Sequence, residues 1–63
     1  MSTELLEDIE QGLFLTRYHG GHRGTCYQIT VADEQGYTKY IQLTKSQMRK
    51  LFKVYLDSIL EGK

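Results

Sequence analysis

The stretch CYQITVADEQGYTKYIQL, residues 26–43, decides the fold of this 63-residue chain. Apolar and polar residues alternate on both sides of DEQG, which places Tyr27 and Ile29 on one face and their neighbours on the other. A four-residue turn that ends in glycine suits two antiparallel strands, because glycine adopts the positive φ that such a turn needs. The sequence therefore predicts a β-hairpin with strands over 26–32 and 37–43.

The segment that follows the hairpin predicts a helix. Residues 44–47, TKSQ, match a capping box, in which the first and last side chains each bond to the other residue's backbone N–H. Apolar residues then recur at helical spacing, at Met48, Leu51, Phe52, Tyr55 and Ile59. We expect a helix over 45–61, ended by Gly62, whose apolar side covers the inner face of the sheet.

The residues before the hairpin predict one further strand and one further helix. Residues 13–18 predict the first strand of the sheet. In residues 1–12, Ser2 or Thr3 is suited to cap a short helix, acidic residues occupy its first turn, and Gly12 is suited to end it. The predicted order of elements is α-β-β-β-α.

Length and composition bound the class of protein. Sixty-three residues make one domain near the lower limit for a self-sufficient core. We predict a single α+β domain over 1–63, with the acidic segment over 1–12, a three-stranded antiparallel sheet over 13–43 and the helix over 45–61. No apolar run approaches the ~20 residues of a membrane span, which excludes a membrane partner. A single cysteine favours a reducing compartment, so we expect a cytoplasmic protein.

Charge is unevenly distributed, although the net charge is zero. Residues 1–12 hold four carboxylates and no base, whereas residues 13–53 hold seven Lys or Arg against two carboxylates, a local net charge of +5. Lys45, Arg49 and Lys53 are spaced four apart and align along one side of the predicted helix. Such a stripe either follows a phosphate backbone or forms the solvated side of an amphipathic helix, and we favour the solvated side.

The loop YHGGHRGTCYQ, residues 18–28, is the candidate functional site. It is longer than the connection between two antiparallel strands requires, and its glycines let backbone N–H groups approach a ligand. Arginine forms paired contacts to phosphate or carboxylate, and tyrosine offers a stacking face. With residues of the flanking strands, the candidate ligand- or partner-binding residues are Arg17, Tyr18, His19, Gly20, Gly21, His22, Arg23, Tyr27, Lys39 and Tyr40.

Metal binding and catalysis are less favoured uses of this loop. His19, His22 and Cys26 have a metal-like spacing but supply only three ligands, so we predict no metal and no cofactor. Cys26 beside a histidine resembles a nucleophile and its base, but no acidic residue lies near them in the sequence to orient the imidazole. The glycines lack the Lys-Ser ending of a phosphate-binding P-loop. We therefore predict that the protein is not an enzyme.

Two surfaces lack a partner in this predicted fold. Val54, Leu56 and Leu60 widen the apolar band of the helix beyond what three strands would bury. The outer face of the sheet carries aromatic residues among polar ones, at Phe14, Thr16, Tyr18, Cys26, Gln28, Thr30, Tyr40 and Gln42. Because a core of this size is marginal, we expect a homodimer whose contact includes the helix or this outer face.

Residues 20–28, GGHRGTCYQ, and residues 40–47, YIQLTKSQ, resemble segments of the very small β-β-α accessory proteins encoded by phages and prophages. The resemblance spans residues 13–60. Proteins of that class are non-enzymatic and bind a host protein, a nucleic acid or a small nucleotide, commonly as homodimers. The resemblance therefore implies a homodimeric, stoichiometric inhibitor or modulator of a host protein. The alternative is a protein that binds or sequesters an anionic ligand, a nucleotide or a single-stranded nucleic acid, through the GGHRG loop and the outer sheet face.

Overall fold

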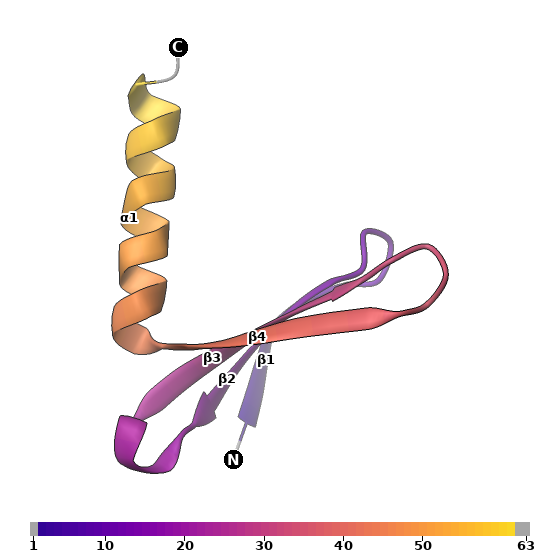
Figure 1. The fold of residues 1–63 in the computed structure, drawn as a ribbon, viewed down its shortest axis with the longest axis horizontal. Helices are drawn as coiled ribbons and strands as arrows, with labels where there is room; N and C mark the ends of the chain where they lie inside the picture. Colours follow the sequence, from indigo (N-terminus) through magenta and orange to yellow (C-terminus); the bar gives the residue numbers. More distant parts are fainter. Residues whose placement is uncertain (1, 62–63) are drawn as a thin grey trace.

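A computed structural model describes residues 2–61 and contains a four-stranded antiparallel sheet followed by one helix (Figure 1). The strands pair in the order β1-β2-β3-β4, and they are β1 (Ser2–Asp8), β2 (Leu13–His19), β3 (Thr25–Ala32) and β4 (Thr38–Thr44). A 3₁₀ turn, η1 (Gly21–Arg23), joins β2 to β3, and the helix α1 (Lys45–Glu61) follows β4. The predicted α+β class is confirmed.

The predicted central hairpin is confirmed. β3 and β4 pair antiparallel, with Ile29 opposite Ile41. Residues directly opposite each other share a face of the sheet, so the alternation in the sequence corresponds to two distinct faces. Asp33 stabilises the turn, because its carboxylate accepts hydrogen bonds from the backbone N–H groups of Gln35 and Tyr37, both at 2.9 Å.

The predicted N-terminal helix is wrong, because residues 2–8 form the edge strand β1. This strand pairs with β2 and carries an irregularity between Glu4 and Leu6. A helix of about seven residues is unstable by itself because nucleation is costly, whereas an edge strand gains backbone hydrogen bonds from its neighbour. Gly12, expected to end a helix, instead lies in the β1–β2 turn with φ of +66°.

The two hairpin turns share a sequence pattern. Residues 8–12 read DIEQG and residues 33–36 read DEQG. In the first turn the Asp8 carboxylate accepts a hydrogen bond from the backbone N–H of Gln11 at 3.0 Å. In the second turn the Asp33 carboxylate accepts the equivalent bond from the backbone N–H of Gln35 at 2.9 Å. Glycine ends both turns with a positive φ. The turn pattern that predicts the hairpin of β3 and β4 therefore also indicates a hairpin of β1 and β2. Interpreting both patterns as hairpin turns predicts four strands.

The start of the helix is as predicted. Thr44 N–H donates to Oε1 of Gln47 at 2.9 Å, and Gln47 N–H donates to Oγ1 of Thr44 at 3.2 Å, so the capping box forms in both directions. Gly62, expected to end the helix, lies outside the described residues. Within residues 2–61, α1 lacks the length and the apolar character needed to cross a bilayer.

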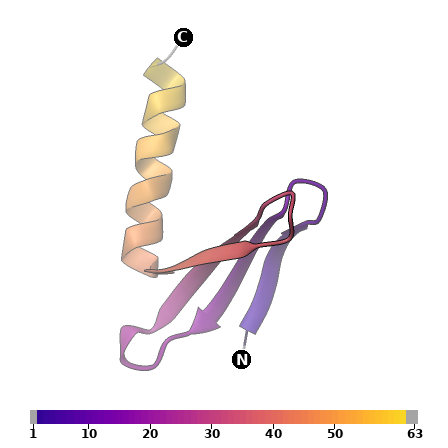
Figure 2. The same cartoon turned by 45° about the vertical axis from the view of Figure 1, so that its right-hand side comes forward.

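The prediction that this helix covers the inner face of the sheet is wrong. β4 ends at Thr44 and α1 begins at Lys45, so no residue is left to turn the chain back, whereas strand-to-helix connections usually take about 2–6 residues. The helix stands away from the sheet instead (Figures 1 and 2). No described residue of α1 is buried, and the buried apolar residues of the described chain are Cys26 and Leu43.

Replacing Gly12 with alanine is expected to destabilise the fold more than replacing Gly36. Both glycines have positive φ, and alanine costs about 1–2 kcal/mol in that conformation. A Cβ on Gly12 would also overlap the backbone oxygen of Ala32, whereas a Cβ on Gly36 meets no atom within 4 Å. Urea unfolding should show a free-energy loss for Gly12→Ala that exceeds the loss for Gly36→Ala by about 1 kcal/mol or more. Equal losses would contradict this account of the first turn.

Candidate functional site

The sheet has one apolar and one polar face, and the polar face is the outer face predicted from the sequence. Across β2 and β3, Thr16 pairs with Gln28 and Tyr18 pairs with Cys26. Across β3 and β4, Gln28 pairs with Gln42. Each pair shares a face, and the same register places all eight residues predicted for the outer face on this side. β1 adds two carboxylates to it, since Glu4 pairs with Thr16 and Glu7 pairs with Phe14.

Side-chain amides and hydroxyls form a row across the middle of the polar face. Gln42 Nε2 donates to Oε1 of Gln28 at 3.0 Å, and Gln28 Nε2 donates to Oγ1 of Thr30 at 3.3 Å. The row borders an open hollow of about 240 Å³ lined by Ser2, Thr16, Tyr18, Gln28 and Gln42. A hollow with this lining presents both hydrogen-bond donors and acceptors to a ligand.

Tyr18 lines this hollow and has an unusual hydroxyl. Its side chain is half-buried, and its hydroxyl oxygen is buried without a hydrogen-bond partner among the described residues. A buried polar group without a partner costs about 1–3 kcal/mol, and such groups are uncommon in folded proteins.

The loop between β2 and β3 is a compact turn. Gly20 N–H donates to the backbone oxygen of Gly24 at 2.6 Å, and Gly24 N–H donates to that of Gly21 at 3.0 Å. These bonds close the loop around η1 and leave the side chains of His22 and Arg23 exposed. The turn therefore presents a guanidinium and an imidazole at one end of the sheet.

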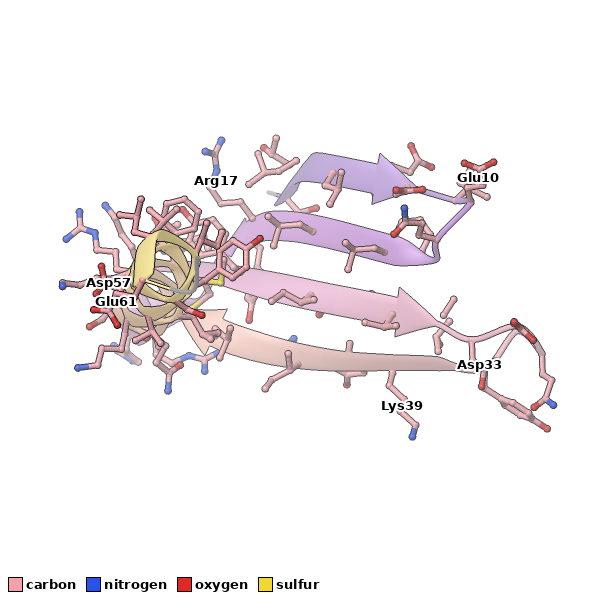
Figure 3. All side chains as sticks on the ribbon, turned by 90° about the horizontal axis from the view of Figure 1, so that it is seen from above. Glu10, Arg17, Asp33, Lys39, Asp57 and Glu61 are labelled. Atoms are coloured by element: carbon pink, nitrogen blue, oxygen red, sulfur yellow. The ribbon has the colours of Figure 1, made fainter. Side chains whose placement is uncertain are left out.

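The structure separates the predicted site residues into groups. By register Arg17 and His19 lie on the opposite face from Tyr18. A second hollow of about 160 Å³ at the loop end of the sheet is nevertheless lined by all three, together with Thr3 and Thr25. Lys39, expected to lie beside the loop, does not: it pairs with Val31, six residues along β3 from Thr25, or roughly 20 Å away. Figure 3 shows Arg17 and Lys39 toward opposite ends of the sheet.

Tyr27 and Tyr40 also lie on different faces. Tyr27 pairs with Leu43 on the apolar face, and it borders the start of the helix, where it lines a hollow with Met48 and Phe52. Tyr40 pairs with Thr30 on the polar face and is 66% exposed. The polar face, rather than the whole predicted set, is thus one continuous surface, with the loop at its end. The contribution of β1 to this surface was not predicted, and the DIEQG pattern is the sequence signal that locates that strand.

The structure describes both the metal-like spacing of the loop and the basic stripe of the helix. Cys26 is 0% exposed, and within residues 2–61 no three His, Cys, Asp or Glu side chains are grouped closely enough to hold a metal ion. Lys45, Arg49 and Lys53 are all exposed, and Nζ of Lys53 lies 3.4 Å from Oδ2 of Asp57. An exposed pair of this kind contributes little to stability.

Comparison of the chain with protein-family models, curated proteins and solved structures gives no match.

The close approach of Gly20 to Cys26 yields a test of the loop. A Cβ on Gly20 would lie 2.5 Å from Sγ of Cys26, and the backbone φ of Gly20, −98°, suits any residue. We expect Gly20→Ala to lower the melting temperature, and Cys26→Ala to lower it through lost burial. The double variant should lose less stability than the two single losses together, because removing Sγ makes room for the new methyl group. Simple additivity in thermal unfolding would show that Sγ does not hold the loop.

Proposed function

We propose that the protein binds single-stranded nucleic acid on the polar face of its sheet, with the β2–β3 loop contacting the phosphate backbone. The observation that carries this proposal is the mixture of side chains on one open face: aromatic rings interleaved with amides and hydroxyls, beside an exposed arginine. Proteins that bind single strands combine rings on which bases stack with cationic groups that contact the backbone. The hollows of the described chain are open, which suits an extended ligand better than an enclosed mononucleotide.

Base contacts are assigned to β2, β3 and β4. Tyr40 offers the most exposed ring of this face, while Phe14 and Tyr18 are half-buried and offer less of theirs. The amides of Gln28 and Gln42 lie between these rings and supply donors and acceptors for base edges. Stacking with a few polar contacts produces binding of modest sequence preference.

Phosphate contacts are assigned to the loop. Arg23 and His22 are exposed there. By register, no Lys or Arg of the paired strand residues lies on the polar face itself, and Glu4 and Glu7 repel phosphate along the β1 edge. The bound strand is therefore placed over β2–β4, with few phosphates neutralised. Because each neutralised phosphate of a single strand contributes about −0.7 to the slope of log K against log salt, one or two neutralised phosphates give an expected slope of about −0.7 to −1.4.

The host-protein inhibitor implied by the phage-type resemblance stays a prediction. The affinity for a protein partner held by aromatic contacts would change little with salt concentration. The affinity for a nucleic acid would fall as the salt concentration rises. The same preparation therefore separates the two functions: a nuclease-treated pull-down that retains a stoichiometric host protein, together with no affinity for oligonucleotides, would favour the inhibitor.

Replacing the exposed ring of the polar face tests base stacking. Tyr40→Ala should weaken binding of a fluorescent oligothymidine by about 5- to 100-fold, the loss expected for one stacked base. Tyr37→Ala is a matched control, because Tyr37 is similarly exposed, at 70%, but lies in the β3–β4 turn. Fluorescence anisotropy measures both affinities. Equal effects of the two substitutions would contradict the assignment of bases to this face.

Replacing the loop arginine tests the phosphate contact. Arg23→Ala should lower affinity for oligonucleotides of any sequence and bring the salt slope about 0.7 closer to zero, with an unchanged melting temperature because Arg23 is exposed. Lys50→Ala, which removes an exposed cation of α1, should leave the slope unchanged. If Arg23→Ala keeps the parent slope in titrations at several salt concentrations, the loop does not contact phosphate.

A further inference from the structure

A single chain exposes far more surface than a compact protein of its size. The accessible surface is 5513 Å², whereas a folded monomer of 7.3 kDa exposes about 4,200 Å². The radius of gyration is 13.4 Å, against roughly 11 Å for a compact chain of this length. The excess surface, about 1,300 Å², is larger than the ~800 Å² that each partner buries in a standard protein interface.

Large apolar side chains are exposed on two surfaces. One is the helix, where residues 48, 51, 52, 55, 56 and 59 fall on one side at helical spacing, and Phe52 is 61% exposed. The other is the apolar face of the sheet, where Leu6, Val31 and Ile41 are 41–55% exposed. Monomeric proteins rarely expose contiguous apolar patches above a few hundred Å².

We infer that a second copy of this chain covers both surfaces, with α1 of each copy lying across the apolar sheet face of the other. The shape of one chain explains why each copy would cover the other. In Figure 3 the helix is seen end-on, whereas the strands are seen at full length, so the helix rises steeply from the sheet. It rises on the apolar side, because Tyr27 of that face shares a hollow with Met48 and Phe52. Two such angled chains, related by a two-fold axis, place each helix over the partner's sheet.

Dimensions and charge fit a second copy. A 17-residue helix is about 25 Å long, and strands of seven or eight residues are about 23–27 Å long, so one helix spans the face of one sheet. The chain has no net charge, so two copies approach without net repulsion. So small a core needs a covering partner that is present whenever the chain folds, and a second copy of the chain meets that requirement.

This arrangement changes the interface expected from the sequence. The contact of the homodimer predicted from the sequence includes the helix or the outer sheet face. The contact inferred from the structure includes the helix and the inner, apolar sheet face. The polar face stays outside the dimer, so dimer formation and binding at the polar face are separable.

Sedimentation equilibrium and thermal unfolding test the dimer. The parent should sediment as twice 7.3 kDa, with a melting temperature that rises with protein concentration. Phe52→Asp should weaken association by roughly 30-fold or more, as loss of a buried aromatic anchor does. Tyr37→Asp, at an equally exposed ring of the β3–β4 turn, should leave association unchanged. If Phe52→Asp unfolds the chain while Tyr37→Asp does not, the inference also holds, because an exposed residue of a lone chain contributes little to stability.

Cross-linking tests the reciprocal geometry. Ile41→Cys is placed on the sheet face in one preparation and Tyr55→Cys in the middle of the helix in another, with Cys26 kept because it is buried. Mixing the two preparations under oxidising conditions should give a disulfide between unlike chains. Three results would overturn the inference: a monomer at all concentrations, a dimer that only cross-links helix to helix, or a dimer disrupted by Tyr40→Asp but not by Phe52→Asp.

Discussion

The direct junction between β4 and α1 is the constraint on which the rest of the structure depends. The reciprocal hydrogen bonds of Thr44 and Gln47 start the helix at the residue after the strand ends. A helix that starts there continues away from the sheet, since it lacks the connecting residues that a return path needs. The apolar side of the helix and the apolar face of the sheet are consequently left uncovered in a single chain. The direct junction thus accounts for both the angled shape of the chain and its exposed apolar surfaces.

The two faces of the sheet then have different roles. The apolar face belongs to the association we infer, because it can be covered only by residues from outside its own chain. The polar face has amides and hydroxyls, whose burial in an apolar contact would cost hydrogen bonds, interleaved with aromatic rings, and the compact loop around η1 adds an arginine at its end. A meander of antiparallel strands suits this division, since such sheets commonly keep one face solvated. The self-association we infer and the ligand binding we propose therefore use opposite sides of one thin layer.

Sequence patterns predicted the parts of the fold that are set by local chemistry. Alternation along 26–43 gave the hairpin and the correct division of residues between faces, and TKSQ gave the first residue of the helix. The N-terminal segment was predicted incorrectly because its carboxylates suit a helix start, while pairing with β2 is a non-local effect. The place of the helix depended on the absence of a linker rather than on its apolar periodicity. In the candidate site, Tyr18 and Tyr40 share a face as expected, but the distance of Lys39 from the loop follows only from strand register.

The position of β1 also has a consequence for solubility. A four-stranded meander leaves two edge strands, and each edge exposes backbone groups that could pair with a strand of another molecule. β1 carries Glu4, Glu7 and Asp8, and its ladder is interrupted between Glu4 and Leu6. Clustered carboxylates repel a like strand, and an irregular ladder cannot be matched by a straight one. The acidic N-terminal segment thus disfavours strand addition at the β1 edge of the sheet.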